Sequence, residues 1–114
     1  MAQQATAPAR SSTHGIVEQL AKFFPQATPL RLAVRVTQPG SDWLGEGAVI
    51  EFGTAREVLF ALFQPLEFGD RVRVENSDGS LDVEATVVAV QYHDGRTAVA
   101  ARFTSAVTNW IVNP

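Results

Sequence analysis

Apolar residues near the start of the chain recur at the three- and four-residue spacing of a helix, and they are Ile16, Val17, Leu20, Phe23 and Phe24. Ser12 or Thr13 can cap the start of this segment, and Pro25 ends it. The pattern predicts one short amphipathic helix that packs its apolar face against the rest of the domain. Residues 1–12 have no such periodicity, so we expect a disordered tail there and a single domain over residues 13–114.

After Pro29 the period changes to two, which is typical of strands with one buried face. Apolar runs follow over residues 30–36, 48–52, 58–63, 72–74, 81–92 and 97–103, and turn sequences rich in Gly and Asp separate nearly all of them. Because sequential strands pair and open edges are a liability, the pattern predicts a mainly β fold, a six-stranded antiparallel sheet that closes or nearly closes into a barrel. Residues 105–112 are a candidate for a C-terminal helix that turns Trp110 onto the barrel.

The composition of the chain argues against several classes of protein. The 114 residues, 46% of them apolar, suffice for one core and not for two. The net charge of −3 argues against binding DNA or RNA through a general positive field. With no Cys and two His, the chain has no disulfide framework, thiolate zinc site or three-histidine metal site. Apolar runs are too short for a membrane helix and the N-terminus lacks a signal-peptide core, so we expect a cytoplasmic protein without membrane insertion.

Charge is divided unevenly along the chain. Residues 1–40 carry four cationic side chains against one acid, whereas the rest carries five arginines against 11 acids. We therefore expect any anion site near the N-terminal third. The acidic strand region also argues against an oligonucleotide-binding barrel, and we expect most of the aromatic side chains to point into the core. These aromatics are Phe52, Phe60, Phe63, Phe68, Tyr92 and Phe103.

Signals of catalysis are weak. His14 lies in the cap region of the helix and His93 in a turn, and neither has a nucleophile or a second His at a useful spacing. The Gly45-Glu46-Gly47 segment leads into a strand, so it lacks the helix dipole with which glycine-rich loops bind phosphate. We expect a protein that is not an enzyme and needs no cofactor.

Several strand segments share a further pattern. Residues 29–36, 47–51 and 58–60 look like the early strands of a known family, and residues 81–90 and 99–103 like its last two. Between them, residues 65–72 read PLEFGDRV, similar to the family's PLxxGxxV turn. In this order, over about residues 22–110, the chain resembles the PilZ domain. That resemblance implies a six-stranded barrel whose typical member binds the bacterial second messenger cyclic di-GMP.

The ligand motifs of that family have changed here. Typical members carry RxxxR before the first strand and [D/N]xSxxG later, because arginine forks grip phosphates and guanine edges bidentately. In this chain Lys22 and Gln26 occupy the two arginine positions, and Glu51, Gly53 and Arg56 the second motif. Every defining position differs, so the resemblance implies that cyclic di-GMP binding is lost or weakened.

Other cationic residues offer alternatives. Arg31 and Arg35 spell RxxxR, but they lie inside the strand pattern and too close to the second motif. Residues four apart on a strand share a face, so these two form a modest outer-face anion patch. Thr54 and Arg56 together offer a substitute phosphate contact.

Two functions remain open. The first is an adaptor that binds a bacterial signalling, motility or surface-structure protein, a context that only the resemblance supplies. The second is a genuine cyclic di-GMP receptor with altered contacts, made by Lys22, Arg31, Arg56 and Arg35.

Overall fold

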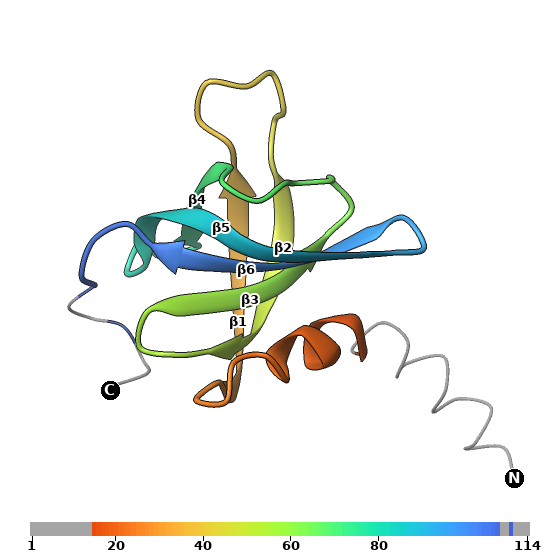
Figure 1. Ribbon diagram of the computed structural model, residues 1–114. Helices are drawn as coiled ribbons and strands as arrows, with labels where there is room; N and C mark the ends of the chain where they lie inside the picture. The colour runs from red at the N-terminus through yellow and green to blue at the C-terminus, as the bar shows by residue number, and fades with distance from the viewer. Residues whose placement is uncertain (1–14, 108–109, 111–114) are drawn as a thin grey trace, which may run out of the picture.

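The computed structural model describes residues 15–107 and Trp110, and in them a short helix at residues 15–21 precedes six strands. The strands are β1 (Thr28–Thr37), β2 (Glu46–Gly53), β3 (Glu57–Leu62), β4 (Arg71–Asn76), β5 (Asp82–His93) and β6 (Arg96–Phe103). They close a barrel in the order β1-β2-β3-β6-β5-β4 with every neighbouring pair antiparallel (Figure 1). The predicted mainly β barrel with a short N-terminal helix is confirmed.

Alternate residues of each strand fill the barrel. The interior cluster includes Val36 from β1, Ile50 from β2, Phe60 from β3, Val74 from β4 and Val99 from β6, all of them fully buried. Closure pairs the outer strands β1 and β4 with each other, so this antiparallel sheet leaves no lone edge strand.

The helix covers one outer face of the barrel. Its buried side chains, Ile16, Val17 and Leu20, pack on Leu59 and Ala61 of β3 and on two alanines of β6. Small side chains on β6 allow the helix to approach closely, and as a result β3 is buried on both of its faces. Figure 1 shows the helix lying alongside β3.

The helix ends sooner than its apolar pattern predicts. Its last residue is Ala21, and the side chain of Phe23 is 70% exposed. The side chain of Phe24, by contrast, is partly buried and packs against the cluster that the helix forms with β3 and β6. The expected tail and the expected helix start at Thr13 lie outside the described residues.

Strands β2 and β3 pair over a short distance only. Their ladder joins Phe52 to Leu59 and Gly53 to Val58, next to the turn that links the strands. At the other end of β2, the carboxylate of Glu46 accepts hydrogen bonds from the backbone N–H groups of Phe63 at 2.7 Å and Gln64 at 3.2 Å. A side chain thus joins the two strands at the end where they have no ladder pairing.

The C-terminal segment closes one end of the barrel without a helix in its described part. Residues 105–107 and Trp110 are not helical, and the rest of the expected helix lies outside the described residues. Trp110 is 6% exposed and belongs to the interior cluster, as predicted. No helix in the described ranges is long and apolar enough to cross a membrane.

The expectation that most aromatic side chains point inward is correct for Phe60 and Phe103, which are buried. It is wrong for Phe52, which is only partly buried and packs against the helix side of the barrel, and for Phe63, Phe68 and Tyr92, whose side chains are 67%, 75% and 58% exposed. Phe63 follows the last residue of β3, Phe68 lies in the β3–β4 connection, and Tyr92 is near the tip of the β5–β6 hairpin. All three lie at or beyond the end of a strand, where the alternation of a strand no longer determines which way a side chain points.

Candidate functional site

A cleft of about 710 Å³ lies between the helix–β1 connection and the β2–β3 turn. Residues 23–26 form one wall, residues 54–57 another, and Arg102 of β6 contributes from the side. Three positions singled out from the sequence, Gln26, Thr54 and Arg56, therefore meet in one place.

The β2–β3 turn is organised by Thr54, which is 7% exposed. Its backbone N–H donates to the carbonyl oxygen of Glu57 at 2.9 Å. Its hydroxyl oxygen accepts from the backbone N–H of Arg56 at 3.1 Å and of Glu57 at 2.9 Å, and the hydroxyl also bonds to the Glu57 carboxylate. The hydroxyl of Thr54 is thus used inside the turn, so the expected phosphate contact by this group would have to break the turn's own bonds.

Glu57 and Arg102 form a cross-strand ion pair beside this turn. Arg102 donates from Nε at 2.8 Å and from Nη2 at 2.6 Å to the same carboxylate oxygen, Oε2. The Glu57 side chain is 10% exposed and that of Arg102 is 52% exposed. The cleft therefore contains a nearly buried carboxylate that neutralises one of its two guanidinium groups. The sequence analysis did not identify this pair. The two residues lie opposite each other in the β3–β6 ladder, and that pairing of strands is what brings them together.

Arg56 supplies the remaining cation of the cleft. Its side chain is exposed and has no hydrogen-bond or ion-pair partner among the described residues. Gln26 is also exposed and adds an amide, and the exposed Phe23 adds a ring face. The cleft thus offers one free guanidinium, one amide and one aromatic surface.

The other positions of the family pattern lie elsewhere. Lys22 is exposed in the turn after the helix and does not line the cleft. Gly53 is buried in the ladder opposite Val58. Glu51 lines a separate hollow of about 270 Å³ together with Arg31 and a second acid, Glu18. Two carboxylates beside Arg31 oppose the binding of an anion there.

Arg31 and Arg35 are both exposed on β1, but they do not form one site. Arg35 lines another hollow, together with Glu75 of β4. Its Nη2 donates to the carbonyl oxygen of Leu44 at 2.6 Å. Arg35 therefore holds the β1–β2 connection, and the two arginines line separate hollows.

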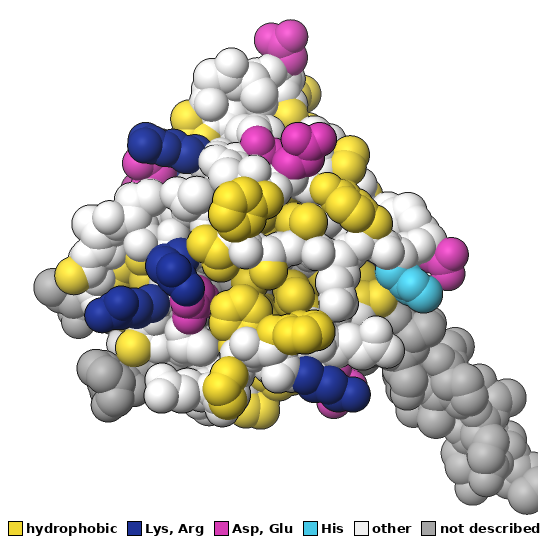
Figure 2. Space-filling model, viewed as in Figure 1, with side chains coloured by type: hydrophobic (Ala, Val, Ile, Leu, Met, Phe, Trp, Pro, Cys, Tyr) yellow, Lys and Arg dark blue, Asp and Glu magenta, His cyan; other side chains and the backbone are white. Residues whose placement is uncertain are grey.

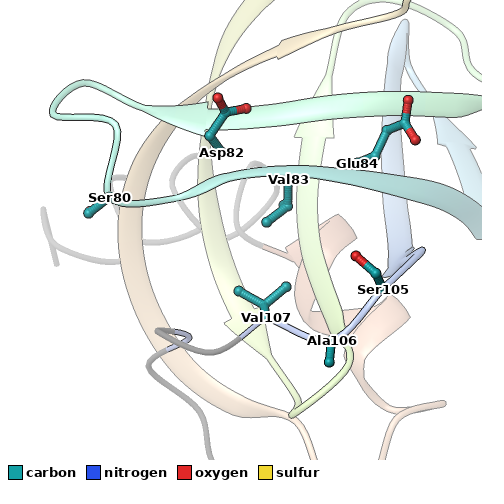
Figure 3. A pocket seen from close by; sticks show the side chains of 7 residues that line it. All are labelled: Ser80, Asp82, Val83, Glu84, Ser105, Ala106 and Val107. Carbon is teal, nitrogen blue, oxygen red and sulfur yellow. The ribbon is translucent and has the colours of Figure 1, made fainter.

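A further hollow of about 310 Å³ lies between β5 and the segment that follows β6. Figure 3 shows Val83 and Val107 pointing toward one another, whereas the carboxylates of Asp82 and Glu84 point away. Arg73 donates two hydrogen bonds to Asp82, at 2.8 and 2.7 Å, and these lower the pKa of Asp82. The hollow therefore lacks a converging acid–base pair. No group of three or more potential metal-ligating side chains occurs within the described part of the chain.

No family model matches the chain, and no curated protein matches it either.

Proposed function

We propose that this chain is a non-enzymatic, PilZ-like domain that works as a protein-interaction adaptor and has lost tight binding of cyclic di-GMP. The barrel with its helix agrees with the fold that the resemblance implies. The observation that carries the proposal is the charge of the cleft, where Glu57 neutralises Arg102 and leaves Arg56 as the free cation. The bacterial signalling, motility or surface-structure context of the partner is part of this proposal and rests on the resemblance.

The energetic argument concerns the two phosphates of cyclic di-GMP. A charge-assisted hydrogen bond contributes about 1.5–3 kcal/mol, and an arginine fork supplies two of them. Lys22 has no fork and Gln26 has no charge, so several such bonds are missing. At about 1.4 kcal/mol for each factor of ten, the loss lowers affinity by several orders of magnitude. Arg102 does not replace the missing forks, because its ion pair with Glu57 leaves no net positive charge at that side of the cleft.

Isothermal titration of the purified chain with cyclic di-GMP tests the proposal, with GTP and cyclic di-AMP as controls and at two salt concentrations. We expect no heat up to about 1 mM ligand, which corresponds to binding weaker than roughly −4 kcal/mol. Selective binding at micromolar concentration would overturn the proposed loss.

A gain-of-function variant makes the test sharper. Lys22→Arg combined with Gln26→Arg puts guanidinium forks back at the two positions of the first motif. We expect this double variant to bind cyclic di-GMP measurably more tightly than the natural chain. If neither protein binds cyclic di-GMP measurably, the assignment of Lys22 and Gln26 to those positions is contradicted.

The second candidate is a cyclic di-GMP receptor with altered contacts. The meeting of Gln26 and Arg56 beside the exposed ring of Phe23 favours it, because a ring and a guanidinium can stack on a purine and grip a phosphate. If it is correct, titration detects binding that Arg56→Ala removes. Arg71→Ala is the matched control, because Arg71 is exposed on β4 and does not line the cleft.

A further inference from the structure

Backbone hydrogen bonds hold both walls of the cleft beside the β2–β3 turn in place. In the wall made by residues 23–26, the N–H group of Phe23 donates to the carbonyl oxygen of Leu20 at 3.0 Å. In the opposite wall, the carbonyl oxygen of Arg56 accepts from the N–H group of Phe103 at 2.9 Å. A cleft with fixed walls loses little conformational entropy when a ligand enters it, so this one is organised in advance for an occupant.

The side chains that line the cleft are left available by the rest of the protein. Gln26 and Arg56 have no hydrogen-bond or ion-pair partner within the described residues. The ring of Phe23, which lines the same cleft, is 70% exposed. Aromatic residues and arginine are enriched where proteins bind one another, and here both types share one hollow.

The charge of the cleft limits what can fill it. Its charged lining side chains are two guanidinium groups and one carboxylate, and the carboxylate, that of Glu57, is bonded to Arg102. The net charge of the cleft is therefore +1 and lies at Arg56. Figure 2 shows Lys or Arg side chains around an acidic one at the left of the molecule, where Figure 1 places the β2–β3 turn. One carboxylate matches this charge, whereas the two phosphates of cyclic di-GMP exceed it.

We propose that the cleft binds a short segment of a partner protein in which one Asp or Glu stands near an aromatic or aliphatic residue. The carboxylate accepts two hydrogen bonds from the planar guanidinium group of Arg56, and the apolar side chain lies on the ring of Phe23. The amide of Gln26 donates to, and accepts from, the backbone of the segment. This inference rests on the proposed adaptor function and gives the place and the chemistry of its docking.

Other occupants fit these features less well. Residues 1–14 of this chain contain no Asp or Glu, so they have no acidic side chain to bring to Arg56. A stable interface between two copies buries about 800 Å² on each of them, and the cleft would form only a small part of it. A short segment needs no surface beyond the cleft itself.

The probe is a library of random twelve-residue peptides displayed on phage and selected against the immobilised full chain. Labelled synthetic copies of the selected peptides are then measured by fluorescence anisotropy. We expect these peptides to carry one Asp or Glu near an aromatic or aliphatic residue. Arg56→Gln should weaken their binding at least about tenfold, and Phe23→Ala at least about fivefold.

Each variant has a matched control elsewhere on the surface. Arg71→Gln changes an exposed arginine on β4, and Phe68→Ala changes an exposed ring in the β3–β4 connection. Neither residue lines the cleft, so both controls should change the binding less than twofold. Arg102 is kept in every variant, because its loss would leave the carboxylate of Glu57 without its cationic partner.

An exchange of charges tests the contact with Arg56 directly. Arg56→Glu should reduce binding of a selected peptide below detection, because two carboxylates then face each other. A peptide in which Lys replaces the acidic residue should bind this variant and not the natural chain. The side chain of Arg56 is exposed and has no partner in the described part of the chain, so the variant should melt like the natural protein.

Several results would overturn the assignment. They are failure to select any peptide, selection of peptides without an acidic residue, and binding that Arg56→Gln and Phe23→Ala leave unchanged while both variants melt like the natural chain. A dimer seen by sedimentation velocity and dispersed by Arg56→Glu would assign the cleft to a second copy instead.

A parallel titration with cyclic di-GMP separates this inference from the proposed function. Tight binding of cyclic di-GMP would overturn the adaptor function whatever the peptides do. If neither cyclic di-GMP nor any peptide binds, only the assignment of the cleft to a partner segment fails. The two failures are therefore distinguishable.

Discussion

The indole Nε1 of Trp110 donates a hydrogen bond of 2.6 Å to the carbonyl oxygen of Thr54, which is 56 residues earlier in the chain. The same indole meets the Phe103 ring edge to face, with centroids 5.3 Å apart. The C-terminal segment is thus tied to the turn that forms one wall of the cleft.

Replacement of Trp110 should therefore destabilise the whole barrel. We expect Trp110→Ala to lower the free energy of unfolding by about 3–5 kcal/mol, because it leaves a cavity and an unpaired buried carbonyl. Trp110→Phe keeps much of the packing and should cost less, about 1–3 kcal/mol. Urea denaturation followed by circular dichroism measures both values. A loss below about 1 kcal/mol for Trp110→Ala would show that the indole contributes little to the closed barrel.

Strand periodicity predicts the core of this fold because burial enforces it. Val34, Val36 and Val74 alternate with exposed residues along β1 and β4, and that alternation is readable without a structure. It fails where the backbone is irregular or a strand ends. The register shift between Val87 and Ala89 is a bulge that no local signal marks.

The candidate site was harder to predict for a different reason. Its ionic pair joins Glu57 to Arg102, which are 45 residues apart, and only the pairing of β3 with β6 brings them together. Arg31 and Arg35 show the opposite case, in which a local motif suggests one site but the residues line separate hollows. In both cases the pairing of strands that are distant in the sequence determines which residues meet. The spacing of residues along one segment does not reveal that pairing.

The ion pair of the cleft leads to a prediction about an uncompensated charge. We expect Arg102→Ala to destabilise the protein by about 1–3 kcal/mol, because Glu57 is 10% exposed and would lose its cationic partner. The value is at the low end for a buried pair, since Arg102 is 52% exposed and water screens it. Adding Glu57→Gln to Arg102→Ala should restore part of the stability, as measured by chemical denaturation. If the double variant instead loses the sum of the stability losses of the two single variants, the Glu57 carboxylate is well solvated.

Two glycines with positive φ provide a matched comparison in the β1–β2 connection. A Cβ at Gly45, where φ is +95°, would lie 2.7 Å from Cγ2 of Thr37 and 2.8 Å from the carbonyl oxygen of Val36. A Cβ at Gly40, where φ is +83°, would meet nothing within 4 Å. Both alanine variants lose about 1 kcal/mol of stability because alanine disfavours a positive φ, and only Gly45→Ala also brings its Cβ too close to neighbouring atoms. We expect Gly45→Ala to be the less stable variant by at least about 1 kcal/mol, and equal midpoints in urea would refute this.

The last prediction concerns acid. The hydrogen bonds from Arg73 lower the pKa of Asp82, and the backbone N–H of Ser80 lowers that of Asp78. Groups whose pKa is lower in the folded state stabilise it above their unfolded pKa, about 3.9, and that contribution is lost as pH falls through the folded value. Thermal melts between pH 7 and pH 2 should therefore show Arg73→Gln below the natural chain near pH 6, with the gap closing below about pH 4. Arg71→Gln, two residues earlier on the same exposed side of β4, should show no such convergence. A gap that persists unchanged at pH 2 would mean that Arg73 stabilises the barrel by packing and not by its charge.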